Sequence, residues 1–118
     1  MATEQEITGK IQEWVRNCGE NFATKLIATY VRDASKRLAD IHQAHASGDR
    51  ALLTRSAHTM KSSSGQVGAM AVSESAKTIE LASRAAKFEE AGAVLPALDA
   101  EFAVAKKVLE AIGASPSA

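Results

Sequence analysis

The sequence of 118 residues contains few cysteines, prolines and aromatic residues, and it carries no net charge. One cysteine, Cys18, excludes a disulfide bond within the chain. Two prolines, seven glycines and only five aromatic residues (one Trp, one Tyr, three Phe) in an alanine-rich chain favour helices over a β-sandwich or barrel. Because 14 basic residues balance 14 acidic ones, no overall charge would attract nucleic acid or an anionic membrane. We therefore expect a protein partner.

Three further features are missing from the sequence, and each narrows the function. No apolar run is long enough for a signal sequence or a membrane span, so the expected compartment is the cytoplasm. No glycine-rich phosphate loop or kinase-like set of nucleotide-binding residues occurs, so the chain should not take phosphate from ATP. The sequence shows no cluster of acidic residues that would hold a metal ion such as Mg²⁺. We therefore expect no cofactor and no kinase activity.

The length predicts one domain, residues 1–113, followed by a frayed tail at 114–118. Apolar residues at helical spacing predict helices near residues 3–17, 21–47, 50–67 and 72–86. Gly48 and Asp49 should end the second helix and cap the third. We expect a loop at 87–92 and a last helix with Pro96 in its opening turn that continues to about residue 112. The predicted fold is all-α, an antiparallel four-helix bundle preceded by a short N-terminal helix.

The chemistry of the chain is expected between residues 55 and 69. A stripe of apolar or small residues indicates one helix face turned to a core; its members are Leu53, Ala57, Met60, Ser64 and Val67. His58 stands one step off this stripe, and Lys61 follows one turn later. A lone helical histidine is usually a surface or structural residue. Two neighbours favour a functional interpretation instead. Lys61 can place a positive charge beside an anion on the ring, and Gly65 costs a helix about 1 kcal/mol, so its presence calls for a reason.

The segment Ala-His-Thr-Met-Lys-Ser-Ser-Ser-Gly-Gln-Val-Gly-Ala resembles the signature of histidine phosphotransfer (HPt) domains of phosphorelays. The family pattern is His, two residues, Lys, usually Gly, small residues, an aliphatic residue and Gly. The matching positions here are His58, Lys61, Ser63, Ser64, Val67 and Gly68. Ser62 stands where Gly is commoner, which places a hydroxyl on the expected docking surface. The resemblance also implies a helical bundle.

An HPt domain would accept phosphate on His58. An imidazole with an ordinary pKa of ~6.5 is mostly neutral and nucleophilic at cytoplasmic pH. Its other nitrogen should be held by an acceptor, for which Glu80 is our candidate, since related HPt domains commonly have Gln or Glu at this spacing. Lys61 and Arg84 would contact the phosphate. An alternative interpretation is equally open: Glu80 and Arg84 form only a surface salt bridge with each other, worth a few tenths of a kcal/mol.

The resemblance implies response-regulator receiver domains as partners, including those of hybrid sensor histidine kinases, and these would supply Mg²⁺. The residues expected to dock the partner are Arg55, Ser62, Gly65 and Gln66. We expect a monomer that binds neither nucleic acid nor membrane. Two other interpretations remain: an adaptor bundle with a vestigial histidine, and a metal-binding bundle that uses His42 and His45.

Overall fold

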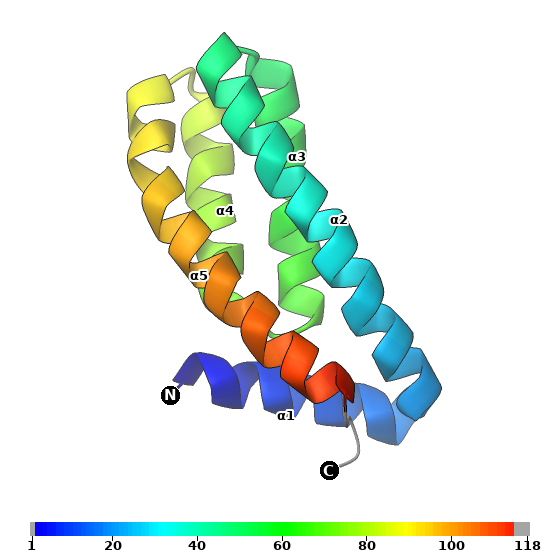
Figure 1. Cartoon of the computed structure of the whole chain (residues 1–118). Helices are drawn as coiled ribbons and strands as arrows, with labels where there is room; N and C mark the ends of the chain where they lie inside the picture. The colour runs from blue at the N-terminus through cyan, green and yellow to red at the C-terminus, as the bar shows by residue number, and fades with distance from the viewer. Residues whose placement is uncertain (1, 115–118) are drawn as a thin grey trace.

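The computed structural model describes residues 2–114, which fold into five α-helices and contain no β-strand (Figure 1). The helices are α1 (Ala2–Cys18), α2 (Glu20–Ser47), α3 (Arg50–Gln66), α4 (Met70–Arg84) and α5 (Phe88–Ala114). The all-α prediction is confirmed. No helix among the described residues is long and apolar enough to cross a membrane.

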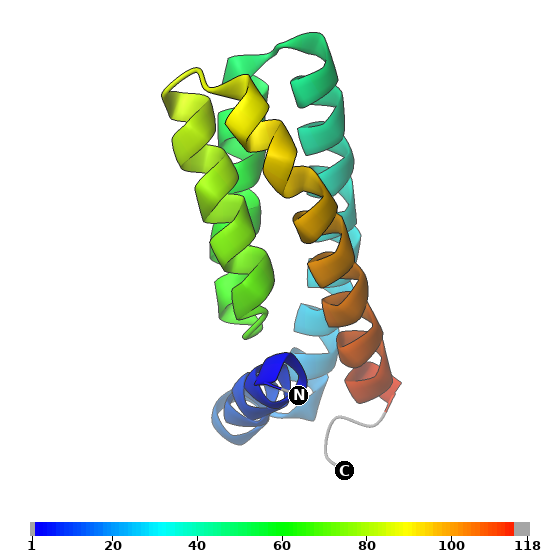
Figure 2. The same ribbon diagram turned by 90° about the vertical axis from the view of Figure 1, so that its left-hand side faces the viewer.

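Helices α2 to α5 lie side by side, and each runs back along its predecessor (Figures 1 and 2). Each of the four packs against two neighbours, α3 against α2 and α4, and α5 against α4 and α2. Helix α1 crosses the end of this group where α2 begins (Figure 2). At 17 residues α1 is as long as α3 and longer than α4, so the prediction that the N-terminal helix is short is wrong. In this arrangement α3 and α5 lie diagonally opposite one another.

Two short turns set the positions of α3 and α4. Gly48 has a φ of 72° and ends α2, and the side chain of Asp49 accepts a hydrogen bond from the Leu52 amide, both as predicted. Gly68, after α3, has a φ of 78°, and a Cβ there would lie 2.5 Å from the Glu6 carbonyl oxygen. Only glycine therefore lets α1 pack directly on the turn between α3 and α4.

The prediction for the start of the last helix is wrong. Residues 88–92, predicted as part of a loop, belong to α5, and Pro96 lies inside this helix, two turns from its start. The real connection is only three residues long, with Ala86 at a φ of 58°. Phe88 is half-buried against the core, which stabilises the extra turns, and Pro96 is exposed, so its ring causes no clash with a neighbouring helix. Pro96 cannot donate to the Gly92 carbonyl, and the first turns of α5 are inclined to the rest (Figure 2).

The C-terminal boundary also differs slightly from the prediction. Helix α5 includes Gly113 and Ala114, so the helix ends two residues later than expected. The remainder of the predicted frayed tail, residues 115–118, lies outside the described residues.

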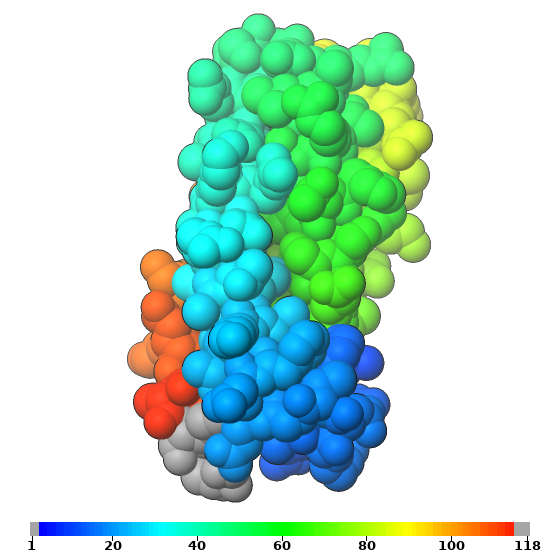
Figure 3. Space-filling model, turned by 90° about the vertical axis from the view of Figure 1, so that its right-hand side faces the viewer, coloured from blue at the N-terminus to red at the C-terminus, as the bar shows by residue number. Residues whose placement is uncertain are grey.

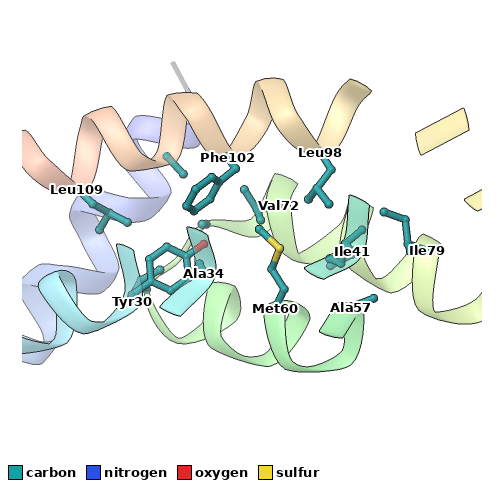
Figure 4. Packing of buried hydrophobic residues seen from close by; sticks show 14 of the residues in the cluster. Tyr30, Ala34, Ile41, Ala57, Met60, Val72, Ile79, Leu98, Phe102 and Leu109 are labelled. Atoms are coloured by element: carbon teal, nitrogen blue, oxygen red, sulfur yellow. The ribbon is translucent and has the colours of Figure 1, made fainter. Parts of the chain in front are cut away.

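The core runs through the middle of the four aligned helices (Figure 4). All five residues of the predicted α3 stripe are buried, so the helical periodicity identified the inward face correctly. Tyr30 of α2 is also buried, and its hydroxyl is paired with Ser64 Oγ at 2.8 Å. Burial raises the pKa of Tyr30 to about 12, against a smaller lowering by the Ser64 hydrogen bond. The tyrosine is therefore a neutral structural group that ties α2 to α3.

Candidate functional site

His58 lies on the outer side of α3, directly beside the buried stripe. Its side chain is 54% exposed. Its Nδ1 lies 2.8 Å from Oε2 of Glu80, which comes from α4. The imidazole is therefore fixed at one nitrogen by the neighbouring helix, while much of the ring faces solvent.

Glu80 is the buried centre of the site, with a side chain only 3% exposed. Lys61 Nζ donates to Oε1 at 2.7 Å, and Arg84 Nη2 donates to Oε2 at 2.8 Å. A carboxylate can be buried at tolerable cost when its oxygens accept several charge-assisted hydrogen bonds. Here two cations and one imidazole share a single carboxylate.

Hydrogen bonds between α3 and α4 hold the two sides of this cluster in register. On one side of His58, Ser73 Oγ donates to the Lys61 carbonyl at 2.9 Å. On the other side, Thr54 Oγ1 and Ser83 Oγ are paired at 2.7 Å. The relative position of the His58 ring and the Glu80 carboxylate is therefore fixed by contacts of both backbones and side chains.

The carboxyl group of Glu80 is ionised at neutral pH. Burial by itself would raise its pKa, but the hydrogen bonds from Lys61, Arg84 and His58 outweigh burial and lower the pKa to about 2. An ionised carboxylate has no proton to donate, so the His58 Nδ1 must carry the hydrogen in this pair. In the neutral ring, the lone pair is then on Nε2.

The structure thus brings together the four residues that the sequence suggested for phosphate chemistry. Glu80 and Arg84 do form a salt bridge. It is not an isolated surface salt bridge, the alternative interpretation of these two residues, because Glu80 is buried and also contacts His58 and Lys61. The part that each residue takes in phosphate transfer stays a prediction.

The expected docking residues belong to α3, whose exposed side is seen in green in Figure 3. Arg55, Ser62 and Gln66 are exposed, and Gly65 is partly exposed. A Cβ at Gly65 would meet only Ser73 Oγ at 3.9 Å, an ordinary contact, so internal packing does not require glycine there. The prediction that Gly65 is small because a partner protein packs over it is therefore compatible with the structure.

A hollow lies beside His58 that the sequence did not predict. Besides His58, Arg55 and Arg84, it is lined by Arg50 and Thr54, which precede the histidine by two turns and by one turn. The spacing of these residues, four and eight before His58, is a signal that could have placed them on its face of the helix.

The two histidines of the metal-binding interpretation have other partners. His42 Nε2 lies 2.7 Å from Asp99 Oδ1, and His45 Nε2 lies 2.8 Å from the Phe88 carbonyl oxygen. Within residues 2–114, no group of three or more His, Cys, Asp or Glu side chains is arranged to hold a metal ion. The geometry therefore gives no support to a shared metal at these two rings.

Comparison with known proteins agrees with this site. The model of the Hpt domain family matches residues 25–110, which include all of α3 and α4. The fold is similar to the crystal structure of histidine-containing phosphotransfer protein B (HptB) from Pseudomonas aeruginosa PAO1. The TM-score is 0.83 at 25% identity, over 88% of this chain and 90% of that one. A comparison with curated protein sequences found no significant match. The chain therefore belongs to the Hpt domain family and has a histidine phosphotransfer role in a phosphorelay.

Proposed function

We propose that His58 is the phosphoryl acceptor of this Hpt domain and that receiver-domain aspartates are its donor and acceptor partners. The observation that carries the proposal is the 2.8 Å contact between His58 Nδ1 and the buried carboxylate of Glu80. This contact fixes the ring, leaves the Nε2 lone pair available and stabilises positive charge that develops on the imidazole during attack.

The transfer step follows from this arrangement. The Nε2 lone pair attacks the phosphorus of an aspartyl phosphate on the receiver, and the bond between phosphorus and the aspartate oxygen breaks. The aspartate leaves as a carboxylate, and the phosphoryl group is now bound to Nε2. Attack by the aspartate of a second receiver reverses these steps. No net proton is needed, because Nδ1 keeps its hydrogen and donates it to Glu80 throughout.

Lys61 and Arg84 are proposed to stabilise the phosphoryl group. Both reach Glu80 from the two sides of His58, and the Arg84 side chain is 60% exposed, so it can turn toward a phosphoryl oxygen. Two cations around one carboxylate leave a net positive charge beside the ring. This charge favours the phosphorylated state over the free histidine.

The remaining parts of the proposal concern the whole domain. We propose that helices α2 to α5 are the antiparallel four-helix bundle of the Hpt domain and that the chain acts as a monomer in the cytoplasm. It has no kinase activity toward ATP, and Mg²⁺ is supplied by the receiver domain. The receivers of hybrid sensor histidine kinases are among the proposed partners.

Incubation with phosphorylated receiver domains tests this function. Wild-type protein should acquire an acid-labile label that is stable to base, as expected for phosphohistidine. His58→Gln should acquire none, with a free energy of unfolding within about 1 kcal/mol of wild type, because an exposed helical position tolerates Gln. His42→Gln is the matched control, since His42 is 45% exposed and also paired with a carboxylate. Labelling of His58→Gln at the wild-type rate would contradict the assignment. No labelling of the wild type by any receiver would favour the adaptor interpretation.

A further inference from the structure

The hollow beside His58 is cationic. Its lining consists of three arginines, Arg50, Arg55 and Arg84, together with Ala51, Thr54 and His58, and includes no carboxylate residue. The chain as a whole has no net charge, so this is a local concentration of positive charge next to the reactive ring.

Two of the arginines are free to bind something else. Arg84 is paired with Glu80, but neither Arg50 nor Arg55 takes part in an ion pair within residues 2–114. Both are exposed. The Thr54 hydroxyl is already bonded to the Arg50 carbonyl and to Ser83 Oγ. The guanidinium groups are thus the polar groups that this hollow offers to an occupant.

The occupant must be larger than a phosphoryl group. Arg50 precedes His58 by eight residues, about 12 Å along the helix axis. A phosphoryl group on the ring would leave the far end of the hollow empty. An anionic group that reaches Arg50 while the ring reacts must therefore belong to the surface that docks over His58.

The exposed side of α3 also differs before and after His58. The part before the ring carries Arg50 and Arg55, which have no ion-pair partner among the described residues. After the ring, the one cation of α3 is Lys61, which is already paired with Glu80, and the exposed Ser62 and Gln66 are uncharged. A partner with one acidic edge would bind in a single orientation on such a face, since charge complementarity fixes the register of an interface.

We propose that Arg50 and Arg55 form a docking subsite for carboxylate side chains of the receiver domain, and that this subsite orients the receiver over His58. The inference rests on the proposed function. A guanidinium group binds a carboxylate through two parallel hydrogen bonds, which gives direction as well as affinity. The residues act on the encounter and alignment of the partner and do not touch the reacting atoms.

The experiment measures transfer kinetics from a phosphorylated receiver that labels the wild-type protein. Arg50→Gln and Arg55→Gln remove one charge each without changing helix propensity greatly. Each should raise KM about three- to tenfold and the double variant more, with kcat unchanged within about twofold. Added salt should raise KM less steeply in the double variant than in wild type. The control is Lys107→Gln, an exposed residue that loses the same charge on α5, diagonally across the domain; its KM should stay within about twofold of wild type.

Phosphoramidate, a small phosphoryl donor that needs no docking, separates docking from reactivity. All four variants should be phosphorylated by it at the wild-type rate. A parallel loss with phosphoramidate would show that the arginines act on the ring, which overturns the subsite. A KM of the double variant equal to that of Lys107→Gln would overturn it as well, with the proposed function intact. If no receiver labels the wild-type protein, both the docking subsite and the proposed function are overturned.

Discussion

Glu80 should make the stability of this domain unusually sensitive to acid. Its pKa falls from 4.5 in the unfolded chain to about 2 in the folded protein. Since a tenfold change in an equilibrium is worth ~1.4 kcal/mol, the ionised Glu80 contributes about 3 kcal/mol at neutral pH. The side chain is only 3% exposed, so solvent screening reduces this value little. A folded pKa below the unfolded one means that the contribution is present above pH 4.5 and is lost as the pH falls toward 2. By pH 3, about 2 kcal/mol should be gone.

Urea unfolding of wild type and Glu80→Gln at a series of pH values measures this contribution. Other carboxyl groups titrate in both proteins, so the difference between the two curves isolates Glu80. The difference should shrink by about 2 kcal/mol between pH 6 and pH 3. Glu110→Gln, at an exposed position of α5, is the control, and its curve should stay parallel to that of wild type within ~0.5 kcal/mol. The same ionised carboxylate predicts a hydrogen on His58 Nδ1, which nitrogen NMR of the ring can detect.

A constant difference between wild type and Glu80→Gln over this pH range would refute the reasoning. It would mean that Glu80 is not an ionised acceptor in the folded protein. The orientation of the His58 ring would then need another cause.

Three further predictions concern Lys61 and two glycines. Lys61→Ala should slow receiver-dependent labelling of the domain about tenfold, because a charge-assisted contact worth ~1.5 kcal/mol is lost. The control is Lys77→Ala on α4, which should not slow labelling. Gly65→Arg should abolish measurable receiver binding in a titration by steric exclusion, yet leave the free domain as stable or up to ~1 kcal/mol more stable; unchanged affinity would remove Gly65 from the interface. Gly92→Ala should instead destabilise the domain by about 1 kcal/mol in urea unfolding, since its Cβ would lie 2.5 Å from His45 Nε2; equal or higher stability would show that this ring moves freely.

The sequence predicted the inward face of α3 and the turn before it because both depend on local rules. Burial of every third or fourth residue requires apolar or small side chains, so the stripe from Leu53 to Val67 could be read directly. Gly48 and Asp49 have conformational and hydrogen-bonding preferences that act within a few residues. His58 was placed correctly at the edge of the stripe for the same reason.

Contacts between helices could not be predicted in this way. Whether Glu80 reaches His58 depends on how α4 is rotated and shifted against α3, which is set by packing and by pairs such as Thr54 with Ser83. The start of α5 was missed because Pro96 and Gly92 weaken a helix locally. Burial of Phe88 and the close fit of Gly92 against His45 override that preference, and both are tertiary effects.

The indole of Trp14 provides this domain with an optical reporter. Trp14 is the chain's one tryptophan, and its Nε1 donates a hydrogen bond at 2.8 Å to the carbonyl oxygen of Gln66, in the last turn of α3. Indole emission changes in colour and intensity with the polarity and hydrogen bonding around the ring. A surface that settles on Gly65 and Gln66 changes both, so a tryptophan-free receiver could be titrated and its arrival timed in a stopped-flow fluorimeter without any attached dye.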